Sequence, residues 1–139
     1  MPENLIVDAS VAVAWVHPAQ STPETQAMLA AVAAGAGLEV PALWPLEVAN
    51  ALLALKRRGR LTERERKRGL EQLRLLPQTV DHDMAAIAFN TLSELAVTYG
   101  LSVYDAAYLE LAIRRKLPLA CKDGPLLAAA KKAGIRVWR

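Results

Sequence analysis

Short apolar runs alternate with longer helical segments along almost the whole chain, and this alternation most constrains the fold. Each run is only a few residues long and is followed by turn or capping residues. Strands that alternate with helices predict parallel pairing and a sheet covered by helices on both faces. We therefore predict an α/β fold, a three-layer α/β/α arrangement around a short, mostly parallel five-stranded sheet. The predicted strands are residues 5–7, 38–41, 79–80, 118–121 and 135–138.

The segments between these runs carry helix signals. Thr62 and Glu65 have the spacing of a capping box, and Pro23 after Thr22 suits a first helical turn. Asp83 is expected to cap a long helix that ends near Gly100. The predicted helices are residues 11–16, 23–34, 43–55, 63–76, 83–96, 106–115 and 126–133.

The length and composition predict one globular domain, residues 1–139. Hydrophobic residues make up 53% of the chain, which excludes disorder by composition. No apolar run approaches the roughly 20 residues that cross a bilayer, and no basic leader precedes the first strand. One cysteine allows no internal disulfide. We therefore expect a cytoplasmic protein with no membrane partner.

Positive charge gathers in residues 56–74, which we call the basic arm. The arm holds nine basic and three acidic residues and carries +6, so the rest of the chain carries −3. A basic arm on a mildly acidic body fits a polyanionic partner. The alternative is a solvated helix face with ion pairs four residues apart, such as Glu63 with Lys67.

Four acids occupy comparable places in the predicted fold. Asp8 and Asp123 directly follow strands, whereas Glu47 and Asp105 lie in first turns of helices. Ligands bind outside the carboxyl ends of parallel strands, so these acids can meet at one edge of the sheet. Each also has a structural explanation, because Asp8 can cap a helix, Asp123 suits a turn, and first-turn acids favour the helix dipole.

Apolar neighbours around Glu47 and Asp105 indicate half-buried carboxylates. Two carboxylates about 4 Å apart repel by roughly 4 kcal/mol at an effective dielectric near 20, so a group of them needs a cation. Oxygen ligands favour Mg²⁺ or Mn²⁺ over Zn²⁺. His17 and His82 form no zinc motif with Cys121, and we interpret both histidines as surface residues.

With these acids in place, the sequence closely resembles the PIN-domain ribonucleases and, among them, the VapC-type toxins of toxin–antitoxin pairs. The resemblance covers nearly the whole chain, and four motifs carry it in order. They are Leu5-Ile6-Val7-Asp8-Ala9-Ser10, Leu46-Glu47-Val48-Ala49-Asn50-Ala51-Leu52, Leu101-Ser102-Val103-Tyr104-Asp105-Ala106-Ala107-Tyr108 and Leu117-Pro118-Leu119-Ala120-Cys121-Lys122-Asp123.

The resemblance implies a metal site formed by the four acids, supported by Ser10 and Asn50. It also implies hydrolysis of single-stranded RNA to 3′-hydroxyl and 5′-phosphate products with one or two Mg²⁺ (or Mn²⁺) ions. A cognate antitoxin protein and a homodimer are implied as partners. The residues expected to contact RNA phosphates are Arg57, Arg58, Arg64, Arg68, Arg114 and Arg115.

Two positions depart from the family pattern. Cys121 stands where Thr or Ser is common, and Gly124-Pro125 stand where many members carry a further acid. Both reduce the ligands for a second metal ion, so the alternative is a catalytically weak PIN domain that binds RNA or protein. A phosphotransfer domain is a poorer match: a dehalogenase-type site wants a second Asp at the position of Ser10, and a receiver wants paired acids at the first strand.

Overall fold

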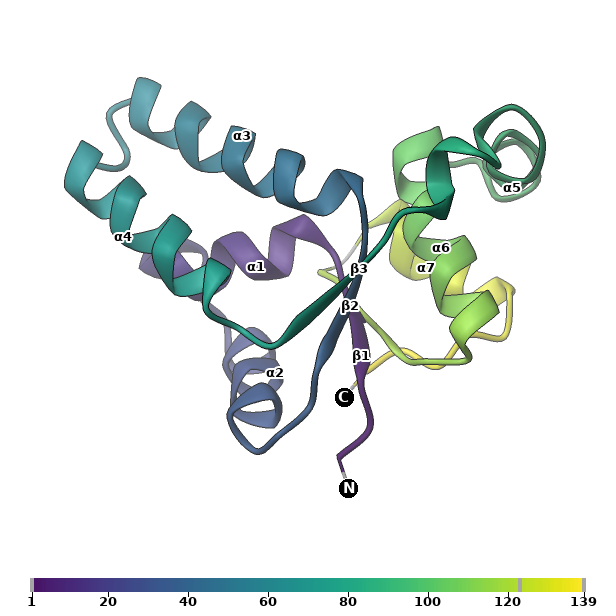
Figure 1. The fold of residues 1–139 in the computed structure, drawn as a ribbon, viewed down its shortest axis with the longest axis horizontal. Helices are drawn as coiled ribbons and strands as arrows, with labels where there is room; N and C mark the ends of the chain where they lie inside the picture. The colour runs from purple at the N-terminus through teal and green to yellow at the C-terminus, as the bar shows by residue number, and fades with distance from the viewer. Residues whose placement is uncertain (1, 123, 139) are drawn as a thin grey trace.

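Helices and strands alternate along the part of the chain that the computed structural model describes, residues 2–122 and 124–138 (Figure 1). The capping boxes at Thr22 and Thr62 are both formed, and each opens a helix. The elements in chain order are β1 (Leu5–Val7), α1 (Ala9–Val16), η1 (Pro18–Gln20), α2 (Pro23–Ala33), β2 (Leu38–Pro41), α3 (Leu43–Arg57), α4 (Glu63–Arg74), β3 (Gln78–Asp81), η2 (Asp83–Ala85), η3 (Ala88–Leu92), α5 (Ser93–Tyr99), α6 (Val103–Arg115), β4 (Leu119–Ala120) and α7 (Pro125–Lys132).

The sheet is short, parallel and buried. Within the described residues its four strands pair in the order β3-β2-β1-β4, and every pairing is parallel. β1 lies in the middle with no exposed side chain, as expected for a strand covered on both faces. The predicted α/β class and parallel sheet are confirmed.

The helices form a layer on each side of the sheet (Figure 1). Helices α1 to α4 lie on one side, and α5, α6 and α7 lie on the other. The core between the layers is aliphatic and includes Val11, Leu52 and Leu109, each fully buried. The predicted three-layer α/β/α arrangement is therefore confirmed.

Helix α4 is highly charged and joins the core through a narrow contact. A Cβ atom added at Gly69 would lie 3.2 Å from Val16 and 3.5 Å from Leu52, so glycine lets α4 approach α1 and α3 closely. Leu73, one turn later, is buried in the same contact. The basic arm is thus held against the domain by a few small and apolar residues.

Three parts of the structure differ from the sequence expectations. Residues 135–138 form a single bridge, between Val137 and Leu119, so the described sheet has four strands rather than five. The long helix predicted from Asp83 was wrong: the Asp83 amide donates to the Asp81 carboxylate, and a 3₁₀ turn (η2) and a π-helical segment (η3) precede α5. His17 is buried, at the end of α1, and is not a surface residue.

No helix among the described residues is long and apolar enough to cross a membrane.

Candidate active site

Asp8 follows β1 directly, and the helix-cap role that the sequence offered for it is formed. Its Oδ1 accepts a hydrogen bond of 3.1 Å from the Val11 amide, so it caps α1. The Ser10 hydroxyl, which we predicted to support Asp8, lies 2.8 and 2.9 Å from its two carboxylate oxygens. The Asp8 amide donates to Ala120 of β4, which anchors the residue at the carboxyl edge of the sheet.

Burial raises the pKa of Asp8 to about 6. The hydrogen bonds from Ser10 and Val11 act in the opposite direction, and the charges of Asp105 and Glu47 add to the rise. The carboxylates of Asp105 and Glu47 therefore lie close enough to Asp8 to change its pKa.

Glu47 lies in the second turn of α3 and is held by a residue that sequence reasoning missed. The Tyr108 hydroxyl of α6 donates a 2.6 Å hydrogen bond to Glu47 Oε1. Burial raises the pKa of Glu47, the Tyr108 hydrogen bond lowers it, and the charge of Asp105 raises it. Burial and Glu47 together raise the pKa of Tyr108, so Tyr108 remains a neutral donor.

Asp105 lies in the first turn of α6, where a capping box was one explanation for it. The Ser102 hydroxyl accepts from the Asp105 amide at 3.0 Å, which is half of that motif. The Asp105 carboxylate accepts no hydrogen bond from the Ser102 amide, or from any other described residue, so the carboxylate takes no part in capping α6. Burial raises the pKa of Asp105.

These three half-buried carboxylates form no ion pair with any described residue, which sets them apart from the other buried or half-buried acids. The buried or half-buried Glu39, Asp81 and Glu110 each lie 2.7 to 2.9 Å from an arginine nitrogen, and the exposed Glu63 and Glu71 lie 2.6 Å from one. Burial raises the pKa of all three carboxylates, and the charges of Glu47 and Asp105 add to the rise at Asp8, so the group lacks a counter-charge. A hard divalent cation such as Mg²⁺ or Mn²⁺ fits that oxygen donor set.

The ligand geometry itself is not formed by the described residues. No three of their His, Cys, Asp or Glu side chains are arranged to hold a metal ion. Asp123, the fourth predicted ligand, lies outside the described residues. Asn50 is exposed on α3, one turn after Glu47, and makes no hydrogen bond in the described part of the chain.

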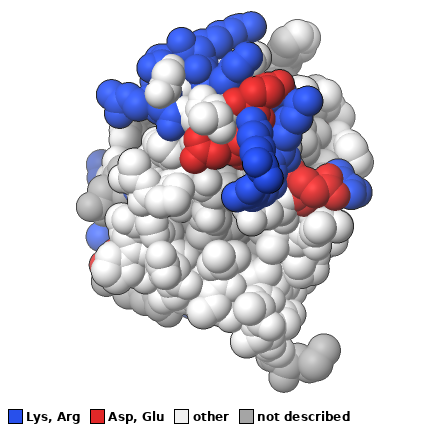
Figure 2. Space-filling view, turned by 90° about the vertical axis from the view of Figure 1, so that its left-hand side faces the viewer, with Lys and Arg blue, Asp and Glu red and all other residues white. Residues whose placement is uncertain are grey.

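The basic arm divides into paired and unpaired cations. Arg66 pairs with Glu63 at 2.6 Å and Arg74 pairs with Glu71 at 2.6 Å, each three residues apart rather than the four expected. On the face of the molecule drawn in Figure 2, lysine and arginine side chains gather in the upper part, with acids among them. The predicted RNA contacts in the arm are exposed and form no ion pair with a described residue: Arg57, Arg58, Arg64 and Arg68.

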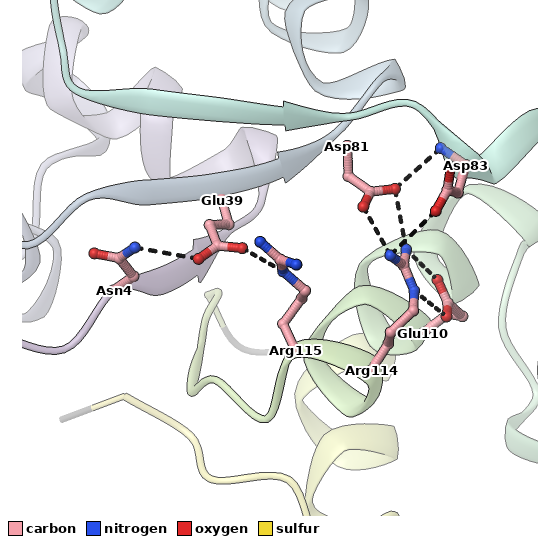
Figure 3. Close-up of polar contacts among 7 residues, drawn as sticks. All are labelled: Asn4, Glu39, Asp81, Asp83, Glu110, Arg114 and Arg115. Atoms are coloured by element: carbon pink, nitrogen blue, oxygen red, sulfur yellow. Dashed lines mark hydrogen bonds and ion pairs between the residues drawn. The ribbon is translucent and has the colours of Figure 1, made fainter.

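The other two predicted RNA contacts, in the last turn of α6, are engaged with carboxylates (Figure 3). Arg114 donates to Glu110 at 2.9 Å, to Asp81 at 2.8 and 3.0 Å and to Asp83 at 3.4 Å. Arg115 donates to the buried Glu39 at 2.7 Å. A phosphate would have to displace these carboxylates, so the contacts favour a structural role for both arginines.

Fold and site together define a small three-layer α/β domain with unpaired carboxylates at the carboxyl edge of its sheet. The chain belongs to the PIN domain family, whose pattern matches residues 5–132. It is 34% identical over 109 residues to Ribonuclease VapC3 of Pyrobaculum aerophilum, covering 78% of this chain and 81% of that protein. The resemblance predicted from the sequence is confirmed.

Solved structures share the fold over nearly the whole chain. The crystal structure of PAE2754 from Pyrobaculum aerophilum matches with a TM-score of 0.69 and 26% identity, covering 93% of this chain and 86% of that one. VapC20 of Mycobacterium tuberculosis, described as a toxin that cleaves the sarcin-ricin loop, matches with a TM-score of 0.64 and 16% identity. That match covers 91% of this chain and 95% of VapC20, and at this identity it shows the fold alone.

Proposed function

We propose that the chain is a Mg²⁺- or Mn²⁺-dependent endoribonuclease and the toxin of a type II toxin–antitoxin pair. The observation that carries the proposal is that Asp8, Glu47 and Asp105 are half-buried and form no ion pair with a described residue, while the charges of Glu47 and Asp105 add to the raised pKa of Asp8. The relative named as a ribonuclease and the unpaired cations of the basic arm support RNA as the substrate.

Asp8, Glu47, Asp105 and Asp123 would hold the metal. When bound, the ion lowers the pKa of an attacking water and stabilises the leaving oxygen of the phosphodiester. Ser10 fixes the orientation of the Asp8 carboxylate through both oxygens. Tyr108 holds Oε1 of Glu47 and leaves Oε2 without a hydrogen bond to any described residue. The unpaired arginines of the arm would bind phosphates along the strand.

Cleavage of a single-stranded RNA by the purified chain tests this proposal. We expect Mg²⁺- or Mn²⁺-dependent cleavage that EDTA abolishes, and a loss of at least about 100-fold in Asp8→Asn and in Asp105→Asn, because each removes a ligand charge. Glu94→Gln, an exposed acid on α5, is the matched control and should cleave normally. Cleavage that survives EDTA contradicts the proposal, and RNA binding without cleavage supports the alternative of a binding module.

We also infer that two copies of the chain associate. Phe89, Val97 and Tyr104 are large apolar or aromatic side chains left mostly exposed on η3, α5 and α6, and such surfaces favour burial in an interface. Light scattering should give twice the chain mass of 15.1 kDa, and Val97→Asp should return it to the monomer. A monomeric wild type contradicts this inference.

An antitoxin protein is the second proposed partner. A small protein encoded beside this chain should co-purify with it and inhibit RNA cleavage. RNA cleavage that this protein does not inhibit would contradict the proposed toxin–antitoxin pair.

A further inference from the structure

A cavity of about 630 Å³ lies at the β4 side of the sheet, outside the carboxylate site described above. Helix α2 forms one wall with Ala27 and Met28, and Lys122 after β4 forms another. Val137 and Trp138 also line it. Its volume falls within the range of small-molecule pockets, roughly 300 to 1,000 Å³, and most of its surface is apolar. We call it the α2–β4 cavity.

The α2–β4 cavity lies next to the carboxyl edge of the sheet. The Asp8 amide donates to Ala120 at 3.2 Å, and Cys121 and Lys122, which line the cavity, are the next two residues of the chain. Extended chain advances about 3.3 Å per residue, so the backbone of Lys122 lies within about 7 Å of Ala120, the residue that the Asp8 amide contacts. A nucleotide next to a phosphate at Asp8 can therefore reach the cavity.

The side chains in the wall suit an unstacked nucleobase. Trp138 offers an indole for stacking, and the indole N–H donates to no other described residue. Glu24, exposed at the start of α2, offers carboxylate oxygens to an amino group on the base. The Lys122 ammonium donates to the Gln20 carbonyl at 3.3 Å, and an ammonium has two further N–H donors that can serve a neighbouring phosphate.

We propose that the α2–β4 cavity binds one unstacked base of the RNA, stacked on Trp138, and that it determines which position of the strand is cleaved. Proteins that select single-stranded RNA read splayed bases in this way, on aromatic side chains beside a basic group. The proposal rests on the proposed ribonuclease function, because it assigns a base subsite to that substrate.

Filling the cavity tests the proposal without removing core contacts. Ala27→Phe places a ring in the cavity from an exposed position of α2, and Ala33→Phe places the same ring on an exposed position of α2 outside the cavity wall. RNA affinity is measured by fluorescence anisotropy in the Asp8→Asn background, which prevents cleavage. We expect Ala27→Phe to weaken binding by about 5- to 100-fold, the effect of losing one stacked base, and Ala33→Phe to change it less than about twofold.

Abasic RNA identifies the base that enters the cavity. In strands of about eight nucleotides, each lacking one base, a single position should lose about 5- to 100-fold in affinity for the protein with Trp138 intact. The same position should lose almost nothing more when Trp138→Ala is present, because the stacking partner is already gone.

The outcomes separate this proposal from the function on which it rests. Unchanged RNA affinity in Ala27→Phe, or an abasic loss that does not depend on Trp138, overturns the base subsite while cleavage and arm-dependent binding remain. That result would mean that the cavity binds no nucleobase and would favour a side chain of a partner protein as its occupant. Absence of both RNA binding and cleavage overturns the ribonuclease proposal itself.

Discussion

At the scale of single residues, Asp8 shows how a carboxylate can cap a helix and still have a strongly shifted pKa. Its Oδ1 caps α1, and both of its oxygens accept from Ser10. These hydrogen bonds stabilise the charged form, yet burial outweighs them and raises the pKa to about 6. The folded chain therefore binds a proton at Asp8 more tightly than the unfolded chain does, and the ionised, buried carboxylate lowers stability at neutral pH.

Asp8→Asn should stabilise the metal-free protein, and the gain should depend on pH. Because the folded pKa lies above the unfolded value of 3.8, the stability that Asp8 contributes is complete below about pH 4 and is lost as the pH rises through about 6. Asparagine keeps an oxygen acceptor and has no charge. In EDTA we expect the variant to gain about 2–3 kcal/mol at pH 8 and little near pH 4, measured as melting temperatures across that range.

Asp81→Asn is the control of opposite sign. The Arg114 hydrogen bond lowers the pKa of Asp81, so its stabilising contribution is present above its unfolded pKa and is lost on acidification. Replacing it should lower the melting temperature at pH 8. A variant of Asp8 that melts below the wild type at pH 8 contradicts the dominance of burial.

The acids could be predicted from sequence, but Tyr108 could not. Asp8 follows an apolar run and Asp105 follows a helix start, and both signals are local. The Tyr108 hydroxyl reaches Glu47 across 61 positions of the chain, from a helix on the other side of the sheet, so that contact depends on the tertiary fold. The spacing of three residues between Asp105 and Tyr108 places them on one helix face, which is the signal that was available.

At the scale of elements, helix α6 connects two different electrostatic environments. Its first turn carries the unpaired Asp105, and its last turn carries Arg114, which joins α6 to Asp81 at the end of β3 (Figure 3). Charge alone suggested that Arg114 and Arg115 contact RNA. Glu110 lies one turn before Arg114, but Glu39 of β2 and Asp81 of β3 lie far along the chain, so the sequence did not reveal that these two acids engage the arginines.

Arg114→Ala should therefore lower stability more than RNA affinity. It leaves Asp81 and Glu110, which are 19% and 12% exposed, without their shared guanidinium. Charged hydrogen bonds of this kind contribute about 1–2 kcal/mol, which corresponds to several degrees of melting temperature. Arg136→Ala, which breaks an exposed pair with Glu3, should change the melting temperature little. A large loss of RNA affinity at unchanged stability would contradict this expectation and show that Arg114 contacts RNA.

At the scale of the whole molecule, the positive and negative sites lie at opposite ends of α3. Glu47 lies near its start and Arg57 at its last residue, and ten residues of helix span about 15 Å. A strand of RNA that reaches the carboxylates can extend along α3 to the unpaired arginines of the basic arm. Gly69 permits this arrangement because it brings α4 close to α1 and α3.

Neutralising Arg57, Arg58, Arg64 and Arg68 to glutamine should reduce both RNA affinity and its dependence on salt. Each phosphate contact to single-stranded nucleic acid contributes about 0.7 to the slope of log K against log salt, so four lost contacts should reduce the slope by up to about 3. The double substitution Glu71→Gln/Arg74→Gln removes an existing ion pair without changing net charge, and its slope should match the wild type. An unchanged slope in the fourfold variant would show that the arm is a solvated helix face. Arginines that bind RNA phosphates release counterions, so removing such arginines must change the slope.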